Sequence, residues 1–323
     1  MDAEVARRTD EEWLCRFDVT RGPLTRFTVH RIAENRHRVV WTTHHMLVDG
    51  WSLSAVLAEE LVTLWSNGAD TTALARVAPA QRHLEWSAAQ DKDAAREAWR
   101  AEFAEVDGAT RLGPADRDRV SVLPETLVAD VPAEVTAALT PWAHDRGLTM
   151  NTVVQGAWAV VLGALTGRQD VTFGAVVSGR PAELPDAERM VGAFLHTLPV
   201  RARLDAAQPF EAMLADLQDR QLGLEPHHHL GLAEVQQCAR TGELFDTVVS
   251  FHNYPTGALD RIGEHIPGLT MLGWKARVAA EYPLAIGVFP GPDGRAAGGG
   301  PVPARPVHRG ADGRLRTPLP PRP

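Results

Sequence analysis

The sequence predicts an α+β fold in which mixed β-sheets are flanked by helices. Short stretches alternate apolar and polar residues, as strands with one buried face do, and longer stretches repeat apolar residues at helical spacing. The two kinds of segment do not follow a strict strand–helix–strand order, which favours a layered, mixed sheet. With 323 residues the chain is longer than a usual single core, so we expect two lobes.

The first elements form a predicted β-hairpin followed by a helix. After a short charged lead and a turn at residues 21–23, residues 24–32 and 37–44 alternate apolar and polar side chains on either side of a short connection. Ser52 is a suitable N-cap for the helix that follows. Leucines recur there at helical spacing and predict a core-facing stripe, made of Leu53, Leu57, Leu61 and Leu64.

Further helices and strands follow in mixed order. Residues 149–165 are apolar nearly all round, so we expect a buried helix there. Residues 81–103 are a polar, helix-rich segment, and the other predicted helices are residues 132–145, 210–222 and 232–239. The predicted strands are residues 127–131, 170–177, 244–251 and 270–279.

Composition sets the expected domain boundaries. From about residue 287 the chain consists almost wholly of Gly, Pro, Arg and Ala, and such a segment cannot bury enough apolar surface to offset its chain entropy. We therefore expect a disordered tail at residues 287–323. The two expected lobes precede it, at residues 1–125 and 126–286. The change at residue 287 suits a linker or a change of reading frame.

Charge, cysteine content and hydropathy argue against several classes of protein. A formal net charge of -8 argues against a nucleic-acid-binding surface, which needs a basic stripe. The two cysteines, Cys15 and Cys238, make no disulfide framework and fit a reducing compartment. No apolar run reaches membrane-spanning length, and the N-terminus is too charged for a signal peptide. We expect a soluble, cytoplasmic protein without nucleic-acid or membrane partners.

The candidate site is the stretch His44-His45-Met46-Leu47-Val48-Asp49-Gly50-Trp51-Ser52, between the second hairpin strand and the following helix. His45 has the side chain whose ordinary pKa lies closest to neutrality, so it could accept a proton from a nucleophile and return it to a leaving group. Asp49 could orient an imidazole, or bind an arginine and so fix the loop. Gly50 permits a close ligand approach that a Cβ would block.

Two other interpretations of this stretch stay open from the residues alone. An Asp-Gly pair is often only a turn. Histidine and aspartate are also metal ligands, but adjacent histidines on a strand point to opposite faces and cannot easily share one ion, so metal binding is less favoured. The three consecutive histidines His227 to His229 cannot converge on one ion either, and we expect them in a solvated loop.

Several segments, taken in order, resemble the condensation domain of nonribosomal peptide synthetases. The similarity extends from about residue 17 to about residue 286. It rests on residues 22–24, the stretch at residues 44–52, the segment around Trp86, and residues 174–181, 190–201, 244–247 and 253–255.

The resemblance implies a fold and a reaction. The fold is two chloramphenicol-acetyltransferase-like lobes in a V-shaped pseudo-dimer, with the N-terminal lobe incomplete and a tunnel between the lobes. In the reaction, the amine of an acceptor aminoacyl group attacks the thioester of a donor acyl or peptidyl group and forms an amide bond. Both groups are carried on the phosphopantetheine of carrier proteins. The implied partners are therefore these carrier proteins and adjacent synthetase modules, and no cofactor is bound by this chain.

The resemblance also assigns roles to residues. His45 is implied as the catalytic histidine, which takes the proton of the amine or orients it, with Asp49 and Gly50 beside it. Asp49 would form a bidentate ion pair with Arg180 and so join the histidine loop to the second lobe, and Gly50 would offer its N–H to an oxyanion. The expected supporting residues are His44, Arg180 and Trp51, and the expected substrate-binding residues are Ser52, Thr197 and Asn253; no metal site is expected.

The chain also departs from the pattern of the family. His196 stands where the family has asparagine, and His252 stands where it has an acidic residue. The histidine motif lies nearer the N-terminus than in the family, and the family's fold continues beyond residues 282–284, so the chain resembles a condensation domain truncated at both ends. Two alternatives stay open: a free-standing acyltransferase that uses a CoA or carrier thioester, and a non-catalytic remnant.

Overall fold

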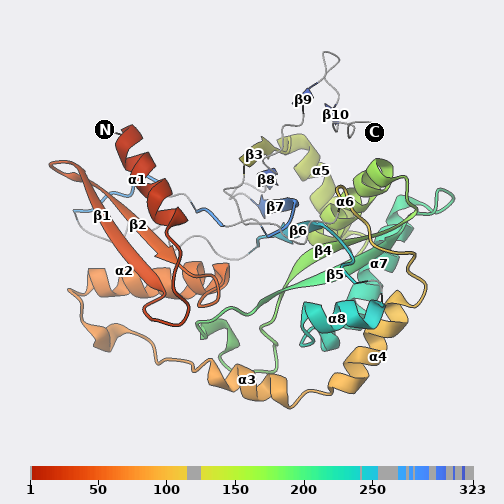
Figure 1. Cartoon of the computed structure of the whole chain (residues 1–323), viewed down its shortest axis with the longest axis horizontal. Coiled ribbons are helices and arrows are strands. Elements are labelled where there is room, and N and C mark those ends of the chain that lie inside the picture. The colour runs from red at the N-terminus through yellow and green to blue at the C-terminus, as the bar shows by residue number, and fades with distance from the viewer. Residues whose placement is uncertain are drawn as a thin grey trace, which may run out of the picture. The chain divides into compact units, whose positions relative to one another are not determined.

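The computed structural model describes residues 2–114, 125–240, 242–253, 268–273, 276–278, 281–290, 296–302, 308–309 and 315–316. Contacts divide the chain into two compact units, whose elements are labelled in Figure 1. The first unit comprises the described parts of residues 1–90, 178–195 and 254–275, and the second comprises those of residues 91–177, 196–253 and 276–323. This division differs from the boundary predicted after residue 125, because residues 178–195 return to pack with the N-terminal segment.

The first unit begins with a helix, α1 (Asp2–Leu14), where the sequence predicts only a charged lead. Glu4 pairs with Arg7 and Arg8 about one turn later, at 2.6 and 2.9 Å, and Arg7 also pairs with Glu11. Opposite charges three or four residues apart stabilise a helix, so this spacing of charges could have predicted α1 from the sequence. Val5 is the buried apolar residue of α1.

The predicted hairpin is confirmed. β1 (Thr25–Ala33) and β2 (Arg36–Thr43) pair antiparallel, with Phe27 opposite Trp41 and Val29 opposite Val39. The rings of Phe27 and Trp41 stack with their centroids 5.0 Å apart. Because β2 ends just before His44, the candidate loop starts at the end of a paired strand, whose register is defined.

The helix after the candidate loop begins earlier than predicted. It starts at Gly50, continues as a π-helical segment, η1 (Ser52–Leu57), and ends as α2 (Ala58–Ser66). Asp49 caps this helix in place of Ser52, because Oδ1 of Asp49 accepts the backbone N–H of Ser52 at 2.7 Å.

The predicted leucine stripe is not the buried face of this helix. Ser52 and Ala58 are fully buried, whereas Leu61 is 45% exposed. The inward-facing positions carry small side chains because the backbone of a distant segment approaches closely there: the carbonyl oxygen of Gly192 lies 2.9 Å from Oγ of Ser52.

The rest of the first unit connects this helix to the returning segment. It contains η2 (Thr71–Ala73), α3 (Gln81–Ala88) and η3 (Ala187–Arg189). Ala78 and Met190 form a parallel bridge, and with Phe194 they make a small buried apolar cluster. The ring of His83 on α3 packs against Phe194, with 4.6 Å between the ring centroids. These contacts hold the returning segment against α3.

A six-stranded sheet organises the second unit, in the order β3-β8-β7-β6-β4-β5. β4 pairs parallel to β6 and β6 parallel to β7, whereas β8 pairs antiparallel to both β7 and β3. The predicted α+β class with a mixed sheet is thereby confirmed. The strands are β3 (Glu125–Asp130), β4 (Asp170–Ser178), β5 (Leu195–Arg203), β6 (Thr247–Phe251), β7 (Leu284–Pro290) and β8 (Ala296–Val302).

The C-terminal strands differ from the sequence-based expectations. Residues 270–273 and 276–278, the described part of the strand predicted at 270–279, form no strand, and β7 lies where none was predicted. β7, β8 and the short pair β9 (His308–Arg309) and β10 (Leu315–Arg316) extend strand structure into the tail predicted to be disordered. Pairing between strands uses backbone groups, so a Gly- and Ala-rich strand such as β8 can extend a sheet that its composition does not indicate.

The sheet of the second unit carries core on both faces. Val248 and Val249, neighbours on β6, belong to different core clusters, because successive side chains of a strand point to opposite faces. In Figure 1, α4 lies alongside α8. The helices are α4 (Lys92–Phe103), α5 (Ala133–His144), α6 (Met150–Thr166), α7 (Phe210–Leu224) and α8 (Leu232–Ala239), with the short η4 (Glu225–His227).

The helix-rich segment predicted at residues 81–103 contains two helices, α3 and α4. Asp91 caps α4 by accepting the N–H groups of Asp93 and Ala94 at 3.0 and 2.9 Å. The buried helix predicted at residues 149–165 needs correction. α6 is buried on one side only, with Val160 and Val161 left 46% and 47% exposed. None of the described helices is long and apolar enough to cross a membrane.

Gly174→Ala tests the close packing on β4. A Cβ at Gly174 would lie 2.5 Å from Cε2 of Phe245 and 2.9 Å from Cγ2 of Val248. Because both neighbours are buried, we expect the free energy of unfolding to fall by about 1–3 kcal/mol in urea denaturation. Gly223→Ala on α7 is the matched control, since a Cβ there meets nothing within 4 Å and alanine is favoured in helices. Equal losses for both variants would contradict this packing.

Candidate functional site

The candidate loop places its two histidines in different surroundings. His44 is half-buried, its Nδ1 accepts the backbone N–H of Met46 at 3.2 Å, and its ring edge lies against Phe17. His45 is exposed, in a turn closed by a hydrogen bond from the N–H of Leu47 to the carbonyl oxygen of His44 at 3.0 Å. The loop therefore holds His44 in place and presents His45 to solvent.

The carboxylate of Asp49 is the centre of a buried polar cluster, and its side chain is 0% exposed. Oδ1 accepts the N–H of Ser52 at 2.7 Å, and Oδ2 accepts the N–H of Phe194 at 3.0 Å. The backbone N–H of Asp49 donates to the carbonyl of Gly192 at 3.0 Å. A buried charge is tolerated only when it is paired and hydrogen-bonded, and these contacts also attach the loop to the returning segment.

Arg180 supplies the positive charge that Asp49 requires. Nη2 of Arg180 lies 3.2 Å from Oδ1 and 3.4 Å from Oδ2, and the arginine side chain is 5% exposed. The predicted ion pair is present, but one nitrogen contacts both oxygens, in place of the two nitrogens of a bidentate fork. Both residues belong to the first unit. Burial lowers the pKa of Arg180 from its ordinary value, and the charge of Asp49 opposes that shift.

Ser52 and Trp51 attach the start of the helix to the same segment. The hydroxyl of Ser52 donates to the carbonyl of Gly192 at 2.9 Å and accepts from Nη2 of Arg180 at 2.9 Å. Because Ser52 is fully buried and its hydroxyl is engaged, the structure gives it a supporting place and not the substrate contact that the sequence predicts. Nε1 of Trp51 donates to the carbonyl of Glu188 at 2.8 Å.

Gly50 is the first residue of the helix that follows the loop. The first N–H groups of a helix have no acceptor within the helix. Here the side chain of Asp49 accepts the N–H of Ser52. The helix thus does not use the N–H groups of Gly50 and Trp51, which lie at the positive end of its dipole. Such a helix start can stabilise a negative charge.

The two remaining predicted substrate-binding residues belong to the second unit. Thr197 is half-buried on β5, and its side chain hydrogen-bonds to Tyr282. Burial raises the pKa of Tyr282 to about 12, so its phenol stays protonated near neutral pH. Asn253 is exposed, shortly after the end of β6. The other predicted site residues therefore all belong to the first unit, whereas Thr197 and Asn253 belong to the second.

Two imidazoles of the second unit are buried enough to lose basicity. Burial lowers the pKa of His228 to about 4, and the charges of His196 and of the adjacent histidines add to the shift. Burial alone lowers the pKa of His252 to about 4, and its Nε2 lies 2.8 Å from Oγ of Ser250. His228 stacks on Trp99, so the solvated loop predicted for residues 227–229 is wrong for this histidine.

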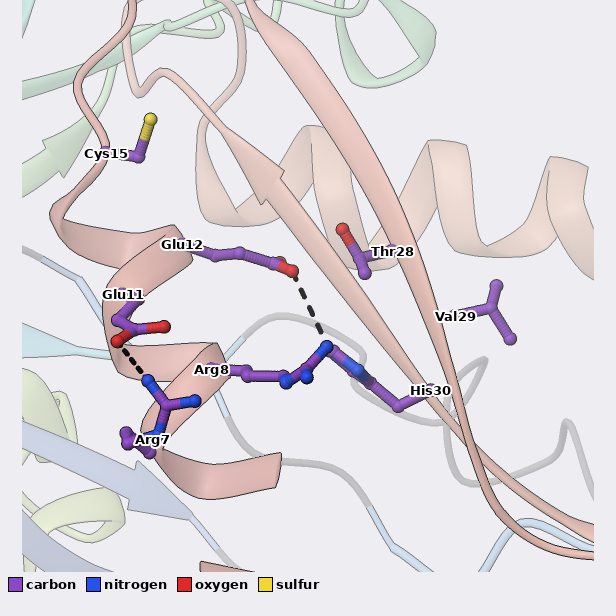
Figure 2. Close-up of a pocket in the computed structure, with 8 residues that line it drawn as sticks. All are labelled: Arg7, Arg8, Glu11, Glu12, Cys15, Thr28, Val29 and His30. Carbon is purple, nitrogen blue, oxygen red and sulfur yellow. Dashed lines mark hydrogen bonds and ion pairs between the residues drawn. The ribbon is translucent and has the colours of Figure 1, made fainter. Parts of the chain in front are cut away.

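A cavity of about 580 Å³ lies between α1 and β1, away from the predicted site residues. Figure 2 shows Glu12 and His30 facing each other there, 3.7 Å apart, and Arg7 paired with Glu11. Among the described residues, no group of three or more His, Cys, Asp or Glu side chains is placed to hold a metal ion. The lining residues are Arg7, Arg8, Glu11, Glu12, Cys15, Thr28, Val29 and His30.

Several partners of the Asp49 cluster are backbone groups that sequence reasoning missed. They are the N–H of Phe194 and the carbonyl groups of Ala187, Met190 and Gly192. Every residue carries such groups, so no residue type marks them. The available signal was residues 190–201, one of the segments that resemble the family, which contains Met190, Gly192 and Phe194.

Comparison with known proteins identifies related sequences. The family model for the condensation domain matches residues 3–295. A linear gramicidin synthase of Brevibacillus parabrevis is 35% identical over 287 residues, which is 85% of this chain and 4% of the relative. Surfactin synthase subunit 3 of Bacillus subtilis (strain 168) is 28% identical over 292 residues, 90% of this chain and 23% of the relative. The chain thus spans less than a quarter of the length of these relatives.

Solved structures show the same fold. The first condensation domain of the CDA synthetase matches with a TM-score of 0.73 and 18% identity, over 96% of this chain and 68% of that one. The X-domain from teicoplanin biosynthesis matches with a TM-score of 0.72 and 21% identity, over 90% of this chain and 69% of that one. The predicted chloramphenicol-acetyltransferase-like fold class is confirmed by this likeness.

Asp49→Asn tests the buried ion pair. The replacement leaves Arg180 buried without a counter-charge, so we expect the free energy of unfolding to fall by about 3–5 kcal/mol in urea denaturation. Glu234→Gln is the control, because it breaks an ion pair with Arg96 whose side chains are 35% and 36% exposed. That loss should not exceed about 1 kcal/mol. Similarly small losses in both variants would mean that the buried pair does not hold the loop.

The stability of the second unit is expected to fall in mild acid through its buried histidines. An unfolded imidazole titrates near 6.5 and that of folded His228 near 4, so the unfolded state binds more protons between these values. The free energy of unfolding should therefore decrease as pH falls from about 6.5 to about 4, measured by urea denaturation across this range. His228→Gln should reduce the slope, and His144→Gln, at a side chain 89% exposed, should not. An unchanged slope in His228→Gln would refute this origin.

Proposed function

The chain belongs to the condensation-domain family, and on that basis we propose that it forms amide bonds in nonribosomal peptide synthesis. The donor is an acyl or peptidyl thioester and the acceptor an aminoacyl amine, each carried on the phosphopantetheine of a carrier protein. The observation that carries this proposal is the geometry of the histidine loop. His45 is exposed on a turn that the buried Asp49–Arg180 pair anchors.

His45 acts on the attacking amine in this proposal. The amine nitrogen bonds to the carbonyl carbon of the thioester, the C–S bond breaks, and the leaving thiol receives the proton that the amine loses. An imidazole can accept or return that proton near neutral pH, or orient the amine through a hydrogen bond. A positioned base contributes about 10²–10⁴-fold, so the tethering of both substrates must supply much of the remaining acceleration.

The start of the helix after the loop stabilises the oxyanion in this proposal. Attack on the thioester places negative charge on the carbonyl oxygen, and preorganised N–H donors lower the energy of that state. The N–H groups of Gly50 and Trp51 are suited to this role because the helix does not use them. Gly50 additionally leaves room for a close approach by the substrate.

Asp49 positions the loop and does not transfer protons in this proposal. Its carboxylate has no exposed surface, and its oxygens accept hydrogen bonds from Ser52, Phe194 and Arg180. A group enclosed in this way cannot reach a substrate.

The proposed partners are carrier proteins and neighbouring synthetase modules. The named relatives are far longer than this chain, which spans 4% of one and 23% of another. The proposed substrate contacts in the second unit are Thr197 and Asn253, and phosphopantetheine enters with the substrates. The cytoplasmic location expected from the two cysteines stays a prediction.

His45→Gln tests the proposed reaction. The assay presents donor and acceptor aminoacyl groups on separate phosphopantetheine-loaded carrier proteins and detects the amide product by mass spectrometry. We expect His45→Gln to lower the rate about 10²–10⁴-fold without a change in thermal stability, because the side chain is exposed. Met46→Gln changes a residue of the same turn that is 56% exposed, and its rate should stay within about threefold.

Two outcomes would contradict the proposal. One is the absence of amide product from the unaltered chain with each of several donor and acceptor pairs. The other is transfer from an acyl-CoA to a small amine or alcohol, which would replace the proposal with the free-standing acyltransferase.

A further inference from the structure

His83 lies on α3 next to the Asp49 cluster and is 8% exposed. Nε2 of His83 is 2.7 Å from the carbonyl oxygen of Gly179. Because a carbonyl oxygen only accepts, Nε2 carries the proton and donates it. Gly179 directly precedes Arg180, so this hydrogen bond holds the backbone from which the arginine side chain starts.

The ring of His83 reaches the cluster by a second contact. It packs on Phe194 with 4.6 Å between centroids, and the guanidinium of Arg180 lies 4.5 Å from the centroid of the same phenyl ring. The N–H of Gly179 donates to the carbonyl of Phe194 at 2.7 Å. His83 thus contacts Gly179 through a hydrogen bond and Phe194 through its ring. Gly179 precedes Arg180, one donor to Asp49, and Phe194 is itself another.

We propose that His83 is a positioning residue for the histidine loop. Its hydrogen bond to Gly179 holds Arg180 and Phe194 where both bind Asp49, and thereby holds the turn that carries His45. The consequence for catalysis rests on the proposed function, whereas the consequence for the order of the loop does not. His83 acts through these residues and contacts no substrate.

Two replacements of His83 distinguish a hydrogen-bonding role from a role in packing alone. Phenylalanine keeps an aromatic ring for Phe194 but has no donor for the carbonyl of Gly179. Glutamine keeps an N–H donor near the position of Nε2 but loses the ring. A buried carbonyl that loses its donor bears the full cost of desolvation, so His83→Phe and His83→Gln separate hydrogen bonding from packing.

Amide hydrogen exchange in the full chain is the first readout. The reporting N–H groups are those of Asp49, Ser52 and Phe194, which the cluster holds. His83→Phe should raise their exchange about tenfold, and His83→Gln should keep it within about twofold of the parent. Leu84→Phe is the control, because it adds a phenyl ring at the next position of α3, where the side chain is 68% exposed. It should leave these amides unchanged.

The exchange data decide the structural part of the proposal. Protection that is kept in His83→Phe and lost in His83→Gln would assign packing to His83 and overturn the proposal. Should His83→Phe fail to fold, His83→Gln decides alone: exchange near that of the parent supports the hydrogen-bond role, and raised exchange refutes it.

Kinetics decide the catalytic part. In the amide-formation assay, His83→Phe should lower kcat about tenfold and leave KM within about twofold, because the geometry of the loop changes and substrate docking does not. His83→Gln should restore kcat. Raised exchange with unchanged kcat would remove His83 from the reaction. An unaltered chain that forms no amide would instead refute the proposed function, and the exchange data would still decide the positioning role.

Discussion

The order of the candidate site depends on the buried carboxylate of Asp49. An ionised carboxylate removed from water is stable only when its oxygens are paired and hydrogen-bonded. The N–H groups of Ser52 and Phe194 and the guanidinium of Arg180 provide that pairing. Ser52 belongs to the same stretch as Asp49, whereas Arg180 and Phe194 belong to the returning segment. Pairing the charge of Asp49 therefore also joins the candidate loop to the returning segment.

This arrangement separates support from reactivity within one short motif. Asp49 and Ser52 are buried and make the contacts that fix the loop, whereas His45 is exposed on the adjacent turn. A functional side chain needs such supporting contacts, because its geometry is retained only where the supporting groups are themselves held in place. The helix that starts at Gly50 is part of the same support, because Asp49 caps it.

Elements with local signals were predicted well. The hairpin follows from alternation, and α6 is marked by a Thr149 cap and by Gly167 in the left-handed conformation at its end. Predictions that needed knowledge of a distant partner failed. β7 was missed and β8 falls in a segment predicted to be disordered, because a strand in the sheet is stabilised by its neighbours more than by its own composition. The prediction that the leucine stripe forms the buried face was wrong, because the backbone near Gly192 lies so close to the helix that small side chains face it.

The sequence by itself determined the family resemblance, the α+β class and the candidate loop, because motif order, periodicity and residue chemistry are properties of the chain. It also suggested Arg180 as the partner of Asp49. Only the tertiary structure decided that Ser52 is buried, that backbone groups complete the cluster and that His83 stands next to it. The physical reason is that a buried charge recruits whatever donors the fold brings within hydrogen-bonding distance, and backbone donors leave no mark in the order of side chains.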